Sequence, residues 1–213
     1  MISRDNVIVA LDGMTETEAL KFAKLLAGKI WGFKINDLLF SDIDLIRKLK
    51  PYGRVFADAK LHDIPNTVAN GVRRLAEAGA DIITVHASGG IEMMKAACRN
   101  SKPAKIVAVT VLTSAPDNKK VTQLVRDAAA AGVGGIVCSG RDLAIIQQIP
   151  AARSLLKVVP GVRPDGYAKK DDQKRIVTPA YARASGADFI VIGRPIIAAS
   201  DPEAALAALD WEE

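Results

Sequence analysis

The sequence predicts an α/β fold, a (β/α)8 TIM barrel that forms a single domain over residues 1–213. Eight short apolar runs alternate regularly with helical stretches along the chain. The runs are almost entirely apolar, as expected of parallel strands that are covered on both faces. A chain of 213 residues also has the length of one such barrel. A doubly wound open sheet is the alternative arrangement of the same elements.

The predicted strands and helices follow one another in order. Thr15 and Glu18 form a capping box, which predicts a first helix that ends near Leu26. Further helical patterns cover 38–50 and 66–79, on either side of the third strand. The segments expected to form strands are 6–12, 32–36, 54–60, 81–87, 105–112, 134–140, 155–162 and 188–196.

Composition and charge limit the classes of partner. The net charge of +5 favours an anionic ligand, either a nucleic acid or a phosphorylated small molecule. Basic residues are scattered among acids and only 5% of the residues are aromatic, so a small substrate is favoured and no nucleic acid is expected. No apolar run approaches the ~20 residues of a membrane helix. Cys98 and Cys138 lie far apart, and no targeting segment is evident, so we expect a cytoplasmic protein that does not bind membranes.

Polar residues follow several of the predicted strands. In either fold the chemistry belongs at the carboxyl ends of parallel strands, where the loops that lead into the helices begin. The strand starts carry far less charge, so we expect the charged groups to gather at one mouth of the barrel. The polar residues at or just after strand ends are Asp12, Lys34, Asn36, Asp58, Lys60, His86, Thr113, Ser114, Arg163 and Arg194.

The motif DAKLHD at 58–63 concentrates charge at the end of the third strand. Because side chains alternate between the faces of a strand, Asp58 and Lys60 should both face the mouth, while the alanines beside them face the helices. An isolated D-x-K pattern is most often an ordinary ion pair. Here Asp12 and Lys34 converge on the same mouth from neighbouring strands, which favours a functional site.

The stretch DAKLHDIPNTV is similar to the signature D-x-K-x-x-D-I-P-x-T of the orotidine 5′-monophosphate decarboxylases. Other motifs of this family recur in the same order along nearly the whole chain: VALD at 9–12, FKI at 33–35, VHASGG at 85–90, VLTS at 111–114, VPGVRPDG with DDQKR after it, and ADFIVIGRPI at 187–196. The resemblance implies a TIM barrel that converts orotidine 5′-monophosphate to UMP in pyrimidine synthesis, with no metal and no cofactor.

The resemblance also implies catalytic roles. Lys60 would lie beside the carbanion that forms at C6 of the pyrimidine and would then protonate it as a general acid. Asp58 would lie near the departing carboxylate, where repulsion falls as CO₂ leaves. Lys34 and Asp63 would complete an alternating row of charges. Asp63 and Thr67 would reach into the site of a partner subunit, which makes a homodimer necessary for activity.

Substrate-binding residues are carried over from the same family motifs. Asp12 and Lys34 correspond to contacts with the ribose hydroxyls, and Thr113 to a contact with the pyrimidine or its linker. Barrels often bind phosphate at the loops after strands seven and eight, where glycines allow close backbone approach and arginine gives a charge-assisted contact. The positions implied for phosphate binding are Arg163, Gln173, Gly193 and Arg194.

A few residues near the motifs receive no chemical role or depart from the family pattern. His62 and His86 are interpreted as structural. Asn36 stands where many members of the family have glycine, and this change could alter the backbone beside Lys34. Ala59 stands where leucine is common and should affect packing only.

Two other functions share some of these features. Magnesium-dependent keto-gulonate phosphate decarboxylases and hexulose phosphate synthases also carry D-x-K-x-x-D, but they have an acid at the position of Lys34. An ammonium there would repel Mg²⁺, so Lys34 favours the metal-free decarboxylase. A basic nucleic-acid-binding protein is the third possibility, and tight, salt-dependent binding to arbitrary RNA would support it.

Overall fold

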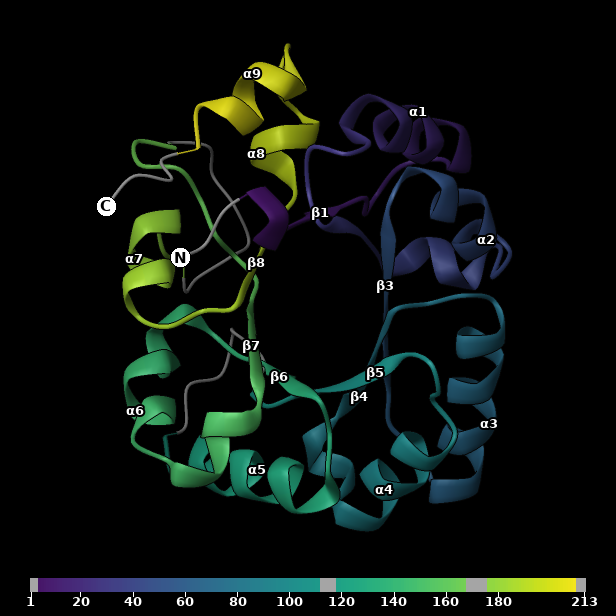
Figure 1. Cartoon of the computed structure of the whole chain (residues 1–213), viewed down its shortest axis with the longest axis vertical. Coiled ribbons are helices and arrows are strands. Elements are labelled where there is room, and N and C mark those ends of the chain that lie inside the picture. The colour runs from purple at the N-terminus through teal and green to yellow at the C-terminus, as the bar shows by residue number, and fades with distance from the viewer. Residues whose placement is uncertain (1–3, 112–117, 168–175, 210–213) are drawn as a thin grey trace.

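The chain folds into a closed barrel of parallel strands surrounded by helices (Figure 1). The computed structural model describes residues 4–111, 118–167 and 176–209. The strands are ordered from β1 to β8 around the barrel, and the first pairs with the last, so that Ile8 lies opposite Val191. This closure excludes the open sheet and confirms the predicted TIM barrel.

The elements alternate along the chain as expected. The strands are β1 (Val7–Ala10), β2 (Gly32–Ile35), β3 (Arg54–Leu61), β4 (Ile82–His86), β5 (Lys105–Val109), β6 (Gly135–Val137), β7 (Leu156–Val159) and β8 (Phe189–Ile192). The α-helices are α1 (Glu16–Leu26), α2 (Leu45–Leu49), α3 (Pro65–Glu77), α4 (Ile91–Arg99), α5 (Asn118–Ala131), α6 (Leu143–Gln147), α7 (Pro179–Ala184), α8 (Arg194–Ile197) and α9 (Pro202–Ala207).

Two apolar cores hold the barrel together. One lies between the strands and the surrounding helices, and the other fills the barrel itself. The side chains of the inner core are Ile8, Ala10, Phe56, Ile82, Val107, Val158 and Val191. Ala57 and Ala59 pack in the outer core, which confirms that they face the helices. Side chains at alternate positions of β3 therefore point into the barrel, as the period of a strand requires.

Helix starts follow the local sequence signals. The Thr15 hydroxyl accepts the backbone N–H of Glu18, and the Glu18 carboxylate accepts the backbone N–H of Thr15, so the predicted capping box is present. α3 begins at Pro65, whose missing N–H is not needed in the first turn. Its buried side chains include Val72 and Leu75, one turn apart on the face that packs against the barrel.

The helix predicted over 38–50 is wrong in its continuity. The structure has a short 3₁₀ helix, η2 (Asp37–Phe40), then a break, then α2. Within the break the Asp42 carboxylate accepts the backbone N–H of Asp44 at 2.8 Å. Aspartate often competes with helix formation in this way, because its short side chain bonds the backbone locally. The apolar periodicity of the segment gave no sign of this competition.

Charge at the strand starts is also greater than the sequence led us to expect. Asp81 and Asp188 immediately precede β4 and β8, and each pairs with a lysine. The Arg54 guanidinium lies over the Trp31 ring, which makes a T-shaped contact with the ring of Phe189. Both mouths of the barrel therefore carry charged groups.

Two further expectations concern membranes and cysteines. Within the described ranges, the structure has no helix that is long and apolar enough to cross a membrane. Cys98 and Cys138 are free thiols, and Cys138 is fully buried. The cytoplasmic location stays a prediction.

Candidate active site

β3 becomes irregular at the motif that concentrates charge. Its pairing with β4 shifts in register between Ala57 and Leu61, and Lys60 adopts a left-handed backbone with φ of +46°. The backbone N–H of Lys60 donates to the Thr84 hydroxyl at 2.9 Å. Asp58 and Lys60 meet as predicted, with 2.6 Å between Oδ2 and Nζ. They meet across a distorted strand end, whereas the sequence predicted regular alternation.

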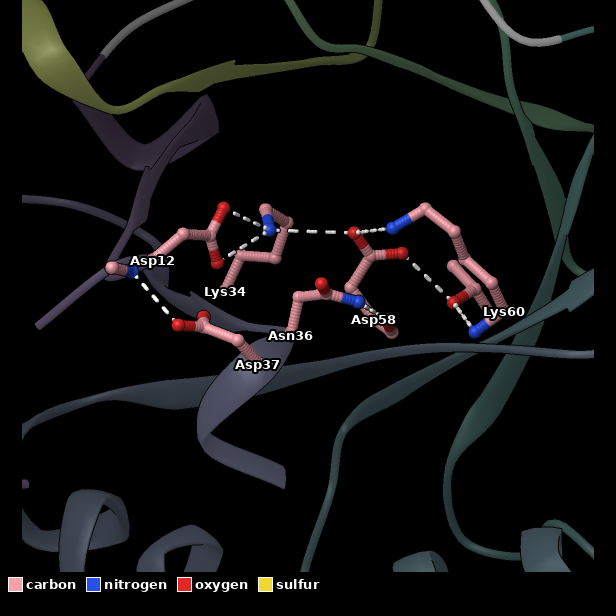
Figure 2. A network of polar contacts seen from close by, with 8 residues as sticks. Asp12, Lys34, Asn36, Asp37, Asp58 and Lys60 are labelled. Atoms are coloured by element: carbon pink, nitrogen blue, oxygen red, sulfur yellow. Dashed lines mark hydrogen bonds and ion pairs between the residues drawn. The ribbon is translucent and has the colours of Figure 1, made fainter. Parts of the chain in front are cut away.

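Four charged side chains from β2, β3 and the loop after β1 form one row, in the order Asp12, Lys34, Asp58 and Lys60 (Figure 2). The Lys34 ammonium lies 2.7 Å from a carboxylate oxygen of Asp12 and 3.3 Å from one of Asp58. One oxygen of Asp58 therefore contacts both lysines, since Lys60 bonds the same Oδ2 atom. The predicted convergence of two acids and two lysines is confirmed.

The centre of this row is buried. Lys34 and Asp58 each expose only 7% of their surface. Burial by itself lowers the pKa of Lys34, but the Asp58 and Asp12 carboxylates outweigh it, so the pKa lies above its ordinary value. Burial likewise raises the pKa of Asp58, but the ammonium groups of Lys34 and Lys60 outweigh it and hold the pKa below its usual range. Both groups are therefore ionised around neutral pH.

Backbone and hydroxyl contacts fix the positions of these charges. The Asn36 side-chain amide donates to the backbone carbonyl of Asp58 at 2.6 Å. The Thr84 hydroxyl donates to the Asp58 carboxylate at 2.9 Å. Next to Asp12, the backbone N–H of Gly13 donates to the Asp37 carboxylate at 3.0 Å, so the loop after β1 is tied to the start of η2 (Figure 2).

The row of charges forms one wall of a cavity of about 480 Å³ at the carboxyl ends of the strands. The floor is apolar and includes Phe56, Val109 and Val191. Gly161 and Gly193, from the loops after β7 and β8, line another part of it. This volume and mixture of surfaces suit a small ligand with both polar and apolar parts.

The structure brings together most of the residues predicted for the site. Those that line the cavity are Asp12, Lys34, Asp58, Lys60, Arg163, Gly193 and Arg194. Asp63 and Thr67 are exposed and lie outside the described lining of the cavity. Thr113 and Gln173 fall outside the described residues. Arg163 is buried and its guanidinium lies over the ring of Tyr167.

The two histidines lie side by side next to the motif. The ring centroids of His62 and His86 are 5.5 Å apart. Burial, then His62 and Lys60, lower the pKa of His86, so this ring is neutral at neutral pH. Neither histidine lines the cavity among the described residues, and their structural role stays a prediction.

Comparisons with known proteins address the family directly. A model of the orotidine 5′-phosphate decarboxylase / HUMPS family matches residues 5–209. The chain belongs to this family. Its members include an orotidine 5′-phosphate decarboxylase from Anaeromyxobacter sp. (strain K), to which the chain is 44% identical, with 96% of each chain covered. The resemblance noted from the sequence is thus confirmed.

Solved structures named as orotidine 5′-phosphate decarboxylases have the same fold. The protein from Lactobacillus acidophilus is 34% identical, with a TM-score of 0.81 over 96% of this chain and 97% of its own. The protein from Pyrococcus horikoshii OT3 is 28% identical, with a TM-score of 0.80 over 95% and 96% of the two chains. This member of the orotidine 5′-phosphate decarboxylase / HUMPS family therefore shares its barrel fold with both.

The sequence interpretation missed some residues of this family member's site. Thr84 was passed over, although a lone hydroxyl in the apolar strand IITVH was a usable signal. Asn36 was noted as a polar residue at a strand end and as a departure from the family pattern, but its bond to the next strand could not be read from spacing. The apolar floor was missed because residues such as Val109 and Val191 look like any other core positions.

Proposed function

We propose that this chain decarboxylates orotidine 5′-monophosphate to UMP in pyrimidine synthesis, without a metal or a cofactor. One contact supports the proposal most directly. The Lys60 ammonium lies at the cavity wall, 2.6 Å from a buried carboxylate that is itself held by Lys34. A cation is thus in place before any substrate binds. Such a preorganised charge is what a reaction with a localised carbanion requires.

The chemistry assigns Lys60 two successive tasks. When the bond between C6 and the carboxylate carbon breaks, CO₂ leaves and the electron pair stays on C6, in the plane of the ring. The adjacent ammonium stabilises this negative charge as it develops. Lys60 then transfers a proton from Nζ to C6 and becomes a neutral amine, which water reprotonates.

Asp58 is proposed to act on the substrate carboxylate that leaves as CO₂. Its pKa lies below the usual carboxyl range because, despite burial, two ammonium groups flank it, so it stays ionised when the substrate binds. A substrate carboxylate placed beside it would be repelled, and the repulsion would fall as neutral CO₂ leaves. Lys34 would keep Asp58 fixed during this step, since its ammonium contacts both Asp58 and Asp12.

The rest of the cavity is proposed to bind the nucleotide. Arg163 and Arg194 carry positive charge to the part of the cavity where Gly161 and Gly193 allow backbone to approach closely, which suits a phosphate. Asp12 and Lys34 would bind the ribose hydroxyls, with Thr113 near the pyrimidine and Gln173 on the phosphate. Binding energy from this distant phosphate can be used at the reacting carbon.

A homodimer is proposed to complete the site. Asp63 and Thr67 flank Ile64, which exposes 66% of its surface at the start of α3. Phe40, at the end of η2, exposes 85%. Apolar side chains exposed to this degree fit a contact between subunits. Such a contact would bring Asp63 and Thr67 into the partner's site.

An assay with and without chelator tests the proposed reaction. Purified protein treated with EDTA should convert orotidine 5′-monophosphate to UMP, with loss of the orotate absorbance. No conversion of orotidine 5′-monophosphate, together with Mg²⁺-dependent decarboxylation of keto-gulonate phosphate, would instead support the magnesium-dependent alternative. Tight, salt-dependent RNA binding without decarboxylation would support the nucleic-acid alternative.

Mixing two inactive variants tests the shared site. In a mixed dimer of Lys60→Ala and Asp63→Ala, one of the two sites receives both native residues. Random mixing should restore about one quarter of the activity, because half of the dimers are mixed and each has one native site. If no activity returns on mixing, Asp63 acts within its own subunit. An Asp63→Ala variant that is active without mixing would show that Asp63 has no role.

A further inference from the structure

Thr84 is a buried hydroxyl that contacts both residues of the D-x-K motif. It lies in the middle of β4 with none of its surface exposed. Its oxygen accepts the backbone N–H of Lys60 and donates to the Asp58 carboxylate, both at 2.9 Å. A hydroxyl has one hydrogen to donate, so it donates this hydrogen bond to the carboxylate. A lone pair of the hydroxyl oxygen accepts the bond from the amide. Both hydrogen-bonding functions of this side chain are therefore committed to the neighbouring strand.

The backbone that Thr84 holds is in an unfavourable conformation. Lys60 is the one residue other than glycine with positive φ in the described part of the chain. A side chain in this region crowds its own backbone, so such a conformation persists only where surrounding contacts impose it. The bond from the Lys60 N–H to Thr84 is such a contact. It replaces the ladder bond that the N–H would make in a regular strand.

Asn36 holds the same segment from the opposite side. Its amide donates to the backbone carbonyl of Asp58 from the end of β2, while Thr84 bonds Asp58 and Lys60 from β4. Asn36 precedes η2 but makes no capping bond with its side chain. The amide of Asn36 thus contributes a contact that a glycine at this position could not make.

We propose that Thr84 and Asn36 are positioning residues that hold the backbone of Asp58 and Lys60 so that the Lys60 ammonium lies beside the reacting carbon. This inference rests on the proposed function, because it assigns the two residues an effect on Lys60 and Asp58. Neither side chain lines the cavity among the described residues. Their loss should therefore slow the chemical step more than it weakens binding.

Two substitutions at Thr84 test the role of the hydroxyl. Thr84→Val keeps the shape but removes both hydrogen bonds, and Thr84→Ser keeps the hydroxyl but removes a methyl group. We expect kcat to fall about 10²-fold in Thr84→Val, since small misplacements of catalytic groups have effects of this size. KM and the Kd for UMP should change less than about 3-fold, because the contacts that bind the ground state and the transition state equally are retained. Thr84→Ser should keep kcat within about 5-fold of the wild type.

Asn36→Ala provides a second test on a half-buried residue, where folding is less at risk than at Thr84. It removes the amide contact and leaves the residues of η2 unchanged. We expect kcat to fall about 10-fold with KM nearly constant, since one hydrogen bond is lost. Circular dichroism and the Kd for UMP, measured on each variant, show whether the protein is folded.

The outcomes separate this inference from the proposed function. A wild type that does not decarboxylate, or a Lys60→Ala variant that still does, overturns the proposed function. If the wild type is active and Lys60→Ala is inactive, equal kcat in Thr84→Val and Thr84→Ser overturns the role of the hydroxyl. If Thr84→Val does not fold, unchanged kcat in Asn36→Ala decides against the inference. A change in KM alone would show that these residues affect binding and not positioning.

Discussion

The two ends of the barrel both pair aspartates with lysines, but they use the pairs differently. At the strand starts, the Asp81 carboxylate accepts the backbone N–H of Val55, and that of Asp188 accepts the N–H of Lys157, both at 2.7 Å. Each carboxylate thus extends the hydrogen bonding between two strands, and each pairs with one partly exposed lysine. These contacts stabilise the strand pairing, and this structural role accounts for the whole arrangement.

At the strand ends the same residue types form a different network. The Asp58 carboxylate bonds Lys34, Lys60 and the Thr84 hydroxyl, all of them side chains. It is nearly fully buried, and it is shared between two cations. Burying one acid with two ammonium groups costs desolvation energy that a purely structural contact does not require. The difference shows that burial and shared charge, and not the presence of an ion pair, distinguish a candidate active site.

A repeated tripeptide places the two aspartates at the strand starts. Gly-Ala-Asp occurs at 79–81 before β4 and again at 186–188 before β8, four strands later. In both places the glycine has positive φ and the aspartate bonds the preceding strand. No such repetition marks the strand ends, where Asp58 is alone in its role among the described residues.

The largest expected effect contrasts one lysine from each end. Lys60→Ala should lower kcat by at least about 10⁴-fold, because it removes both a preorganised charge and a general acid. Lys50→Ala, which removes the partner of Asp81, should leave kcat within about 2-fold, since exposed ion pairs contribute little. Steady-state kinetics on both folded variants checks the contrast. If Lys60→Ala retained turnover, the two ends of the barrel would not differ in function as proposed.

The same contrast applies to stability at Asp58 and Asp81. Asp58→Asn should lower the free energy of unfolding by about 3 kcal/mol at pH 7, because the buried Lys34 and the half-buried Lys60 lose the carboxylate that they share. Asp81→Asn keeps an acceptor for Val55 and loses only a partly exposed ion pair, so it should cost about 0–1 kcal/mol. Urea unfolding of both variants measures these values.

The loss of stability in Asp58→Asn should become smaller as the pH falls. Since the pKa of folded Asp58 lies below its ordinary value of about 3.9, its contribution is present above that pH and is lost as pH falls through the lower folded-state pKa. The difference between the wild type and Asp58→Asn should therefore shrink on acidification and stay constant between about pH 5 and 9. A difference that grows in acid would contradict the ionised state assigned to Asp58.

The smallest expected effect contrasts two arginines. Arg194→Ala should weaken UMP binding about 10- to 100-fold, the range expected for one charge-assisted hydrogen bond. The same substitution should hardly affect uridine, which lacks the phosphate. Arg54→Ala at the other mouth removes a contact with Trp31 and should leave both affinities unchanged. Calorimetric titration with the two ligands checks this, and equal losses for UMP and uridine would contradict a phosphate contact at Arg194.

Much of the fold was predictable because it depends on local patterns. Apolar runs of strand length, the capping box at Thr15 and the proline that begins α3 act over a few residues. The charged residues of the site were also predictable, because parallel strands bring their carboxyl ends to one mouth. The break in the segment 38–50 was missed, since an aspartate can favour either a helix or a local turn and its bond to Asp44 decided between them.

The sequence by itself determined the order of elements, the set of charged residues at the strand ends and the family. Only the tertiary structure decided that β1 pairs with β8, that Lys60 turns left-handed and that Asn36 and Thr84 hold Asp58 from two sides. These features join atoms on different strands, far apart in the chain. Their geometry follows from register and packing across the barrel, which no local pattern of residues specifies.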